Sequence, residues 1–343
     1  MSTIKFKPKQ VSKKLMSALS DRSKEVIESR YGLGKNIERM TLEAIGKHYG
    51  ITRERVRQIE NHSIAAIRKS RFYSEEKPVF DELEQLIRDL GGVIVEQDLL
   101  DHISKDKSLQ NHINFLLVIG HPFKKIKEDD DFKHRWFVDE DLSGKVHTSL
   151  KKIYENLKDE DLVSETEMIK AFMDQVKDLA EKIKNEEVVR RWLSISKKIG
   201  KNPLGEWGKT TSPNISTKGM RDYAFLVIRK HGSPIHFKEV ARIISEVFNK
   251  KAHIATCHNE LIKDQRFVLV GRGLYALSEW GYMSGVVKDV IRKILEKNGP
   301  LTKEEIINKV MKERYVKENT IAVNLQNSKY FKKNKDGKYI IAK

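Results

Sequence analysis

The sequence predicts a mainly α-helical chain with a helix-turn-helix bundle at its N-terminus, followed by a tandem array of three to four small winged-helix modules. Two observations support this. Residues 41–71 contain two helical apolar patterns separated by a glycine. Further along, a pattern of helix, glycine-containing turn, two helices and a hairpin recurs over roughly 60 residues. Three such copies of similar length are difficult to obtain by chance.

Residues 41–71 begin with a short helix and a tight turn. Thr41 is a suitable N-cap for the first helix, which has apolar residues at helical spacing. Gly50 is expected to end this helix, and Thr52 can cap the longer helix that follows. The stretch is therefore predicted to fold as a helix, a turn and a second helix.

The second helix, which begins at Arg53, has different chemistry on its two sides. Its predicted apolar arc contains Val56, Ile59, Ser63, Ala66 and Ile67. Its opposite arc contains Glu54, Arg57, Gln58, Asn61 and Arg68. Arg53 and Arg55 lie on the flanks. This arrangement suits a helix that enters the DNA major groove, where arginine pairs with guanine, glutamine with adenine and glutamate with cytosine. The alternative is an ordinary solvated basic helix. The position after a short helix and a glycine turn favours DNA recognition.

The same residues carry a family resemblance. TLEAIGKHYGITRERVRQIENHSIAAIRKSR closely resembles region four of bacterial primary sigma factors, which recognises the promoter −35 element. The upstream LSDRSKEVIESRYGL is similar to the first half of that region, so the resemblance covers about residues 15–71. It implies base contacts by Arg53, Glu54, Arg57 and Gln58, although the helical wheel alone places Arg53 on an edge. It also implies a DNA-backbone contact by Arg55.

The remaining candidates for contacts to the DNA backbone are Thr52, Asn61, Arg68 and Lys69. No segment resembles the sigma regions that bind and melt the −10 element. We therefore do not expect this chain to open promoters by itself.

Composition indicates a soluble, helix-rich chain with a polyanionic partner. The 343 residues include 39% apolar and 34% charged side chains and carry a net charge of +17. Double-stranded DNA is the leading candidate partner. The single cysteine, Cys257, excludes an internal disulfide and a multi-cysteine zinc site, and we expect a cytoplasmic, nucleoid-associated protein. No apolar run approaches the ~18 residues of a membrane span, so no membrane association is expected.

Charge is distributed unevenly along the chain. Residues 1–72 carry a net charge of +10, residues 73–212 a net charge of −6 and residues 213–343 a net charge of +13. An acidic middle would repel phosphates and is better suited to protein contacts or spacing. The basic N-terminal segment MSTIKFKPKQVSKK lacks the apolar region of a secretory signal. Residues 5–14 are expected to form a poorly ordered arm that can touch phosphates.

Five domains are predicted. They are a helix-turn-helix domain at 1–72 and winged-helix-like modules at 78–142, 145–209, 218–282 and 284–343. In the module at 145–209 the second helix is expected at 164–183, and the wing is doubtful because NPLGEWGKT lacks alternation. The polar stretch TTSPNISTK at 210–218 is the clearest predicted boundary.

Another resemblance concerns residues 220–282. The helix at 223–228, the turn GSPIHFKEVA and the hairpin GRGLYALSEWG resemble the HARE-type helix-turn-helix, a winged-helix family. The resemblance implies association with DNA or RNA polymerase and does not choose between them. GRG at 271–273 lacks the helix and Lys-Ser/Thr of a phosphate loop and is predicted to be a turn between strands. Candidate secondary DNA contacts are Lys250, Lys251, Arg272 and Lys333, for which a solvated basic face is the alternative.

No enzymatic site is predicted. Asp129, Asp130 and Asp131, with His134 nearby, are interpreted as a solvated turn because consecutive carboxylates at a hairpin tip point in different directions. No nucleophile elbow, phosphate loop or metal-binding pattern is present in the sequence, so neither a cofactor nor a metal is expected.

Three functions are consistent with the sequence. The first is a sequence-specific transcription regulator that recognises a −35-like promoter element. The second is a sigma-like or delta-like accessory factor of RNA polymerase. The third is a nucleoid or DNA-defence adaptor that binds DNA without sequence choice. Without a heptad repeat, a monomer is the default expectation. The sequence does not distinguish an activator from a repressor.

Overall fold

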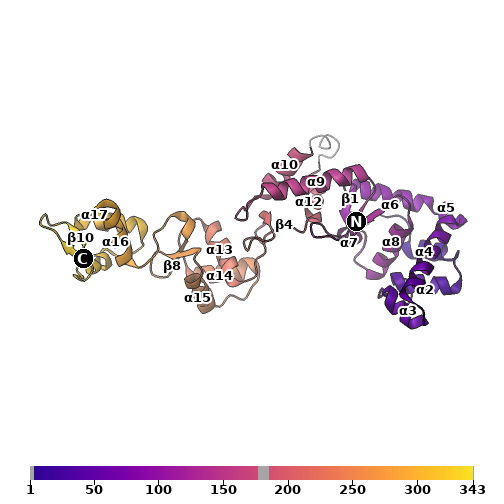
Figure 1. Ribbon diagram of the computed structural model, residues 1–343, viewed down its shortest axis with the longest axis horizontal. Coiled ribbons are helices and arrows are strands. Elements are labelled where there is room, and N and C mark those ends of the chain that lie inside the picture. The colour runs from indigo at the N-terminus through magenta and orange to yellow at the C-terminus, as the bar shows by residue number, and fades with distance from the viewer. Residues whose placement is uncertain (1–3, 177–184, 343) are drawn as a thin grey trace. The chain divides into compact units, whose positions relative to one another are not determined.

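The computed structural model describes residues 4–176 and 185–342, which are mainly helical with small antiparallel sheets (Figure 1). This confirms the predicted fold class. The chain divides into two compact units, one of residues 1–200 and 207–210 and one of residues 201–206 and 211–343. No helix in the described ranges has both the length and the apolar composition to span a membrane.

The described helices of the first unit are α1 (Pro8–Met16), α2 (Asp21–Tyr31), α3 (Leu42–Tyr49), α4 (Arg53–Lys69), α5 (Arg71–Glu75), α6 (Lys77–Asp89), α7 (Glu96–Ile103), α8 (Lys107–Ile119), α9 (Glu140–Asn156), α10 (Glu165–Gln175) and α12 (Glu186–Ile195). Its strands are β1 (Val93–Val95), β2 (Lys124–Ile126), β3 (Arg135–Phe137), β4 (Ile199–Lys201) and β5 (Trp207–Lys209). The helix predicted at 164–183 corresponds to α10, and residues 177–183 of that prediction lie outside the described residues.

Residues 8–16 of the N-terminal segment are helical, so the expected disorder is wrong for residues 8–14. Helix α1 begins with Pro8, whose fixed φ suits the first turn of a helix. Its apolar side, which includes Leu15 at 0% and Met16 at 3% exposure, is buried. Lys14 forms an ion pair with Glu76, its Nζ lying 2.7 Å from the carboxylate. The lysines of α1, which suggested disorder, lie on its solvated side.

One apolar core joins the N-terminal helices to the module that follows. Buried residues of α1, α2 and α4 belong to the same cluster as those of α6, α7 and α8. The ring centroids of Tyr31 on α2 and Phe115 on α8 lie 5.3 Å apart. A helix-turn-helix of about 60 residues has a marginal core by itself, and α8 adds apolar surface to it. Figure 1 shows α8 beside α2 and α4.

The three-stranded sheet β1-β3-β2 is covered on both faces. Ile94 and Trp136 lie in the core shared with the N-terminal helices. Val93, Val95 and Phe137 lie in a second core formed by α9, α10 and α12. Alternate residues of a strand point to opposite faces, so this short apolar sheet serves two cores at once. This arrangement joins the first three predicted domains into one compact unit.

The same strand order recurs in each of the four modules. In each, a short extended segment before the second helix pairs with the last strand of the hairpin. The pairs are β1 with β3, Val163 with Trp207 on β5, β6 with β8, and Leu301 with Tyr339 on β10. The module at 145–209 therefore has a hairpin, β4–β5, where the sequence left the wing doubtful. Its strands are too short to show alternation in the sequence.

The hairpin tip at residues 129–131 is bound to the rest of the first unit. Asp131 forms ion pairs with Lys151 and Lys198. The Asp129 carboxylate accepts hydrogen bonds from the backbone N–H groups of Asp131 and Phe132. The three acidic side chains thus sit in a turn stabilised by cations of the next module.

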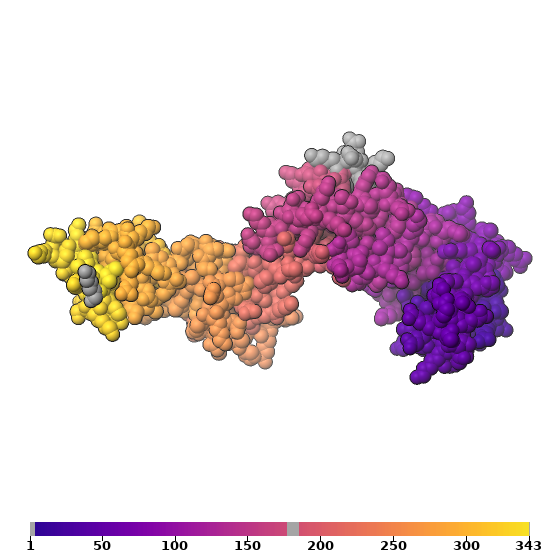
Figure 2. All heavy atoms as spheres, in the orientation of Figure 1, coloured from indigo at the N-terminus to yellow at the C-terminus, as the bar shows by residue number. Residues whose placement is uncertain are grey.

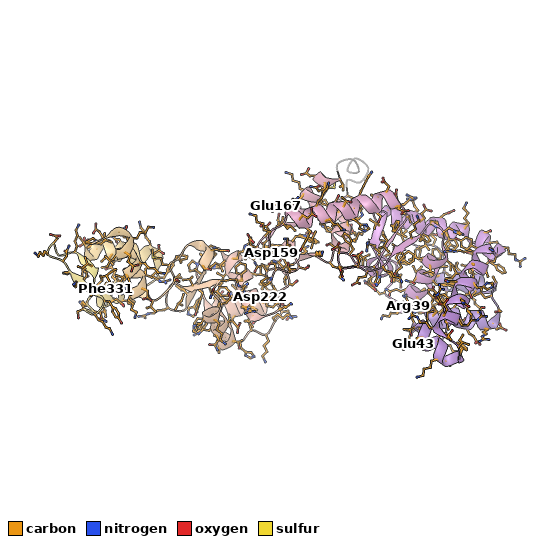
Figure 3. The ribbon with its side chains drawn as sticks, in the orientation of Figure 1. Arg39, Glu43, Asp159, Glu167, Asp222 and Phe331 are labelled. Carbon is orange, nitrogen blue, oxygen red and sulfur yellow. The ribbon has the colours of Figure 1, made fainter. Side chains whose placement is uncertain are left out.

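The second unit contains two modules. Its described helices are α13 (Met220–His231), α14 (Phe237–Phe248), α15 (Ile254–Lys263), η1 (Ser278–Trp280), α16 (Val287–Asn298), α17 (Lys303–Glu313) and α18 (Glu318–Leu325). Its strands are β6 (Ile235–His236), β7 (Phe267–Leu269), β8 (Leu274–Leu277), β9 (Phe331–Lys333) and β10 (Tyr339–Ile341). Asp222, labelled in Figure 3, is buried on α13 and accepts a hydrogen bond from Arg266 at 3.0 Å.

The buried contact between Arg135 and His147 makes the first unit sensitive to acid. Arg135 is 3% exposed, and its Nε donates to His147 Nε2 at 2.7 Å. Burial, reinforced by this guanidinium, lowers the pKa of His147 from 6.5 to about 4. The folded state therefore holds His147 neutral while the unfolded chain binds a proton below pH 6.5. The resulting stability is fully present above that pH and is lost as pH falls toward 4.

We expect His147→Asn to lose less unfolding free energy than the wild type between pH 7 and pH 4.5. The difference should be on the order of 1–2 kcal/mol, which allows for partial solvent screening of His147. The measurement is the free energy of unfolding in urea at pH 7 and pH 4.5. His62→Asn, which changes an exposed histidine, is the control and should retain the wild-type pH dependence. An unchanged pH dependence in His147→Asn would contradict this assignment.

Candidate nucleic-acid interface

The helix-turn-helix forms where the sequence predicts it. The Thr41 hydroxyl accepts a hydrogen bond from the Ala44 N–H at 3.1 Å, and that of Thr52 accepts from the Arg55 N–H at 3.1 Å. Both helices therefore begin with a capped turn. Gly50 ends α3 in the left-handed conformation, with a φ of 65°. The predicted caps and stop are confirmed.

A small apolar core fixes the angle between α3 and α4. It consists of Val26, Ile45 and Val56, each at most 1% exposed. Gly46 permits the close approach of the turn, since a Cβ at this position would lie 2.6 Å from the carbonyl oxygen of Ile51. The backbone geometry thus holds the outer side of α4 at a defined angle to α2 and α3.

The outer side of α4 carries all four predicted base-contacting residues. Arg53, Glu54, Arg57 and Gln58 are exposed. The Arg57 guanidinium donates two hydrogen bonds to the Glu54 carboxylate, at 2.8 and 2.7 Å. These bonds hold the pKa of Glu54 below its usual value. The four side chains form one polar surface, which we call the α4 face. In Figure 2 the N-terminal helices, in indigo, are exposed on the side shown.

The predicted DNA-backbone contacts fall into two groups. Thr52, Arg55, Asn61 and Lys69 are exposed around the α4 face, and Arg55 donates to the Gln58 side chain at 3.1 Å. Arg68 is half-buried instead. Its guanidinium donates to the carbonyl oxygens of Val118 and Ile119, both at 2.9 Å. Arg68 thereby satisfies the carbonyls at the C-terminal end of α8, which have no partner within that helix.

Glu60 anchors α4 to α2 and was not singled out from the sequence. It is 9% exposed and accepts hydrogen bonds from Tyr31 Oη at 2.8 Å and Arg30 Nε at 3.3 Å. Burial, followed by the Glu60 carboxylate, raises the pKa of Tyr31. Glu60 lies two helical turns after Arg53, beside the apolar arc, which is the one signal that could have identified it.

A second anchor reaches the loop before α3. The side-chain oxygen of Asn111, on α8, accepts from Arg39 Nε at 2.7 Å. Its amide nitrogen donates to the carbonyl oxygens of Gly32 and Ile37, at 3.0 and 2.8 Å. Arg39, labelled in Figure 3, is thereby held by the module that follows the helix-turn-helix. The position of α3 therefore depends on α8 as well as on its own helices.

The candidate secondary contacts lie on separate segments of the second unit. Lys250 and Lys251 are exposed in the loop between α14 and α15, and Arg272 is exposed in the turn between β7 and β8. This turn confirms the interpretation of residues 271–273, because the two flanking strands pair in an antiparallel hairpin. Lys333 is exposed at the end of β9, in the other module.

The arrangement defines a helix-turn-helix domain whose second helix presents a cationic, polar face. Residues 15–69 match the family model of sigma-70 region 4, which confirms the resemblance over this segment. Over 55 residues the chain is 44% identical to the RNA polymerase principal sigma factor HrdD of Streptomyces griseus, with 16% of each chain covered. Over 70 residues it is 43% identical to the RNA polymerase sigma factor SigA of Listeria monocytogenes, with 20% of this chain and 18% of that protein covered. The matches thus span under a fifth of the length of these relatives.

Replacing Glu60 should destabilise the helix-turn-helix. Glu60→Ala leaves the buried Tyr31 hydroxyl without its acceptor and leaves Arg30 with the Met40 carbonyl alone, at a cost of about 1–3 kcal/mol in unfolding free energy. Urea unfolding of the full chain measures this loss. Asn61→Ala is a matched control on the exposed side of the same helix and should change stability by less than about 0.5 kcal/mol. Equal effects of the two variants would show that Glu60 does not anchor α4.

Proposed function

We propose that this protein is a sequence-specific DNA-binding transcription regulator that acts in transcription initiation and recognises a −35-like promoter element through the α4 face. The observation that carries the proposal is the exposure of Arg53, Glu54, Arg57 and Gln58 together on a helix whose segment matches sigma-70 region 4. The relatives that match this segment are named as RNA polymerase sigma factors, which supports a role in transcription initiation.

The chemistry of the α4 face suits the major groove. Arg57 can donate two hydrogen bonds to guanine, Gln58 can pair with adenine, and Glu54 can accept from the cytosine amino group. The Glu54–Arg57 ion pair is more than half exposed on both sides, so opening it on binding costs little. Arg55, Asn61 and Lys69 are placed to contact flanking phosphates. Thr52 can donate its hydroxyl hydrogen to a phosphate while its oxygen accepts from the Arg55 N–H. Arg68 is not proposed as a phosphate contact because its guanidinium donates to backbone carbonyl oxygens of α8.

Surface chemistry supports base recognition by α4 rather than by the corresponding helices of the second unit. Net charge does not distinguish the two ends, since residues 1–72 carry +10 and residues 213–343 carry +13. In the second unit, α15 and α18 hold the position of third helix in their modules. They expose Ile254, Ile262 and Val323 rather than a row of arginines. Lys250, Lys251, Arg272 and Lys333 remain secondary candidates for phosphate contacts.

RNA polymerase is a second candidate partner, favoured by the names of the matching relatives. Because α8 covers one side of the helix-turn-helix, a polymerase contact would use another surface of this domain. Co-purification of RNA polymerase that survives nuclease treatment would support an accessory factor. Tight binding to specific DNA without such co-purification would support the regulator. The HARE-type resemblance of residues 220–282 is compatible with both, as is a cytoplasmic, nucleoid-associated location.

Base recognition can be tested with two DNA duplexes of equal composition, one carrying a bacterial −35 element and one with that element scrambled. Arg57→Ala and Gln58→Ala should each weaken binding to the first duplex by about 1–3 kcal/mol and have little effect on the second. Fluorescence anisotropy at fixed salt measures both affinities.

Lys69→Ala is the control for a phosphate contact. It should weaken binding to both duplexes about equally and reduce the slope of log affinity against log salt by about 1. If Arg57→Ala behaves in the same way as Lys69→Ala, the α4 face does not recognise bases.

A further inference from the structure

A groove with apolar walls lies between the two modules of the second unit. Its volume is about 930 Å³, and its walls come from α14, α15 and the β7–β8 turn on one side and from α17 and the start of α18 on the other. Nine large apolar side chains are exposed in the described residues, and four of them line this groove: Leu269, Val286, Met311 and Tyr315. Such a concentration of exposed apolar surface is typical of an interaction site.

Arg314 forms the floor of the groove and holds its two sides together. It is 3% exposed, and its guanidinium donates to the carbonyl oxygens of Leu269 and Gly285, both at 2.7 Å, and to that of Met283. The Tyr315 N–H donates to the Val270 carbonyl at 2.6 Å. These bonds connect the hairpin of one module to the end of α17 in the other. The groove is therefore built from fixed backbone.

The close approach of these two segments requires a glycine. A Cβ at Gly271 would lie 2.9 Å from both Cβ and the carbonyl oxygen of Tyr315. One wall is also held by stacked rings, since the centroids of Phe237 and His258 lie 4.1 Å apart with their planes at 18°. The side chains around the groove thus need little rearrangement to receive a ligand.

The groove is positively charged. None of its lining residues is acidic, while Arg272 and Lys317 are exposed at its rim. Within the described residues, the buried Arg314 forms no ion pair; its charge is compensated by three backbone carbonyl dipoles and, at longer range, by the neighbouring Glu313. The Glu313 carboxylate itself accepts from the Met283 N–H at 3.2 Å. The exposed cations Arg272 and Lys317 therefore carry the attraction for a negatively charged ligand.

We propose that this groove binds an acidic peptide segment of a partner protein, in which a bulky apolar side chain is flanked by aspartate or glutamate. The apolar residue would occupy the space among Leu269, Val286 and Met311, and the flanking carboxylates would meet Arg272 and Lys317. This function is separate from the proposed DNA recognition by α4, which lies in the other unit.

A peptide suits the groove better than a single-stranded nucleic acid. Nucleobases require free aromatic faces. The faces of Phe237 and His258 are stacked on each other, and Phe237 also stacks on His236. Of the aromatic lining residues only Tyr315 is exposed, the remaining walls are mostly aliphatic, and two exposed cations at the rim offer few partners for a chain of phosphates. A peptide that combines an apolar side chain with carboxylates fits both the aliphatic walls and the cationic rim.

The test begins with selection of random 12-residue peptides displayed on phage against the full chain. Recovered peptides should combine Leu, Phe or Trp with adjacent Asp or Glu. A fluorescently labelled copy of one such peptide is then titrated with the wild-type chain and with Arg272→Glu/Lys317→Glu. The charge reversal should weaken its binding by about tenfold or more, because it replaces two attractive contacts with two repulsive ones.

The matched control is Lys250→Glu/Lys251→Glu, which changes the net charge equally at a loop that does not line the groove. It should leave peptide affinity within about twofold. Leu269→Ser should weaken peptide binding as well, while the binding of promoter DNA stays unchanged. Failure to recover acidic peptides, or equal losses in the two charge-reversal variants, would overturn the proposal. Binding of a labelled oligothymidine in competition with the peptide at this groove would assign it to nucleic acid instead.

Discussion

The packing of α1, α2 and α4 against α8 is the contact on which the proposed DNA-binding face depends. The helix-turn-helix has only a small core of its own, around Val26, Ile45 and Val56. Its larger apolar side belongs to the cluster shared with the next module. Asn111 and Arg68 add hydrogen bonds across the same boundary. The orientation of α4 is thus set by residues far from it in the sequence.

The β1-β3-β2 sheet extends this dependence through the first unit. Because both faces of the sheet are buried, a single strand residue such as Ile94 supports one core while its neighbour Val95 supports the other. The three predicted N-terminal domains therefore fold as one compact unit.

The sequence predicted much of the helix-turn-helix because that information is local. Helical periodicity located the exposed side of α4, and the caps at Thr41 and Thr52 and the stop at Gly50 formed as expected. Contacts over long sequence separations were not predictable in this way. Asn111 binds a loop more than 70 residues away, and Arg68, assigned to DNA from its angle on the wheel, donates to α8 instead.

Short elements account for the other differences between the prediction from sequence and the structure. The strands β4 and β5 have three residues each, too few to show alternation, and Trp207 on β5 also pairs with Val163, which is distant in sequence. The lysines of the N-terminal segment suggested disorder, although the buried side of α1 determines its structure. In the second unit, the groove between the modules depends on Arg314, whose partners are three carbonyl groups that no sequence pattern reveals.

The second unit differs from the helix-turn-helix in the chemistry that it exposes. Helix α4 presents arginines, glutamate and glutamine, whereas α15 and α18 present isoleucine and valine. Repetition of one fold therefore does not imply repetition of one function. A chain with a DNA-binding face at one end and a protein-binding groove in its other unit would connect a promoter site to a partner protein.

Selection of bound sequences from a random pool of DNA duplexes tests the central claim most directly. If the α4 face recognises bases, the full chain should enrich one short motif, and Arg57→Ala should lose the preference at a single position of that motif. Absence of any enriched motif, together with a steep decline of affinity with salt, would contradict the claim and indicate binding to DNA without sequence choice.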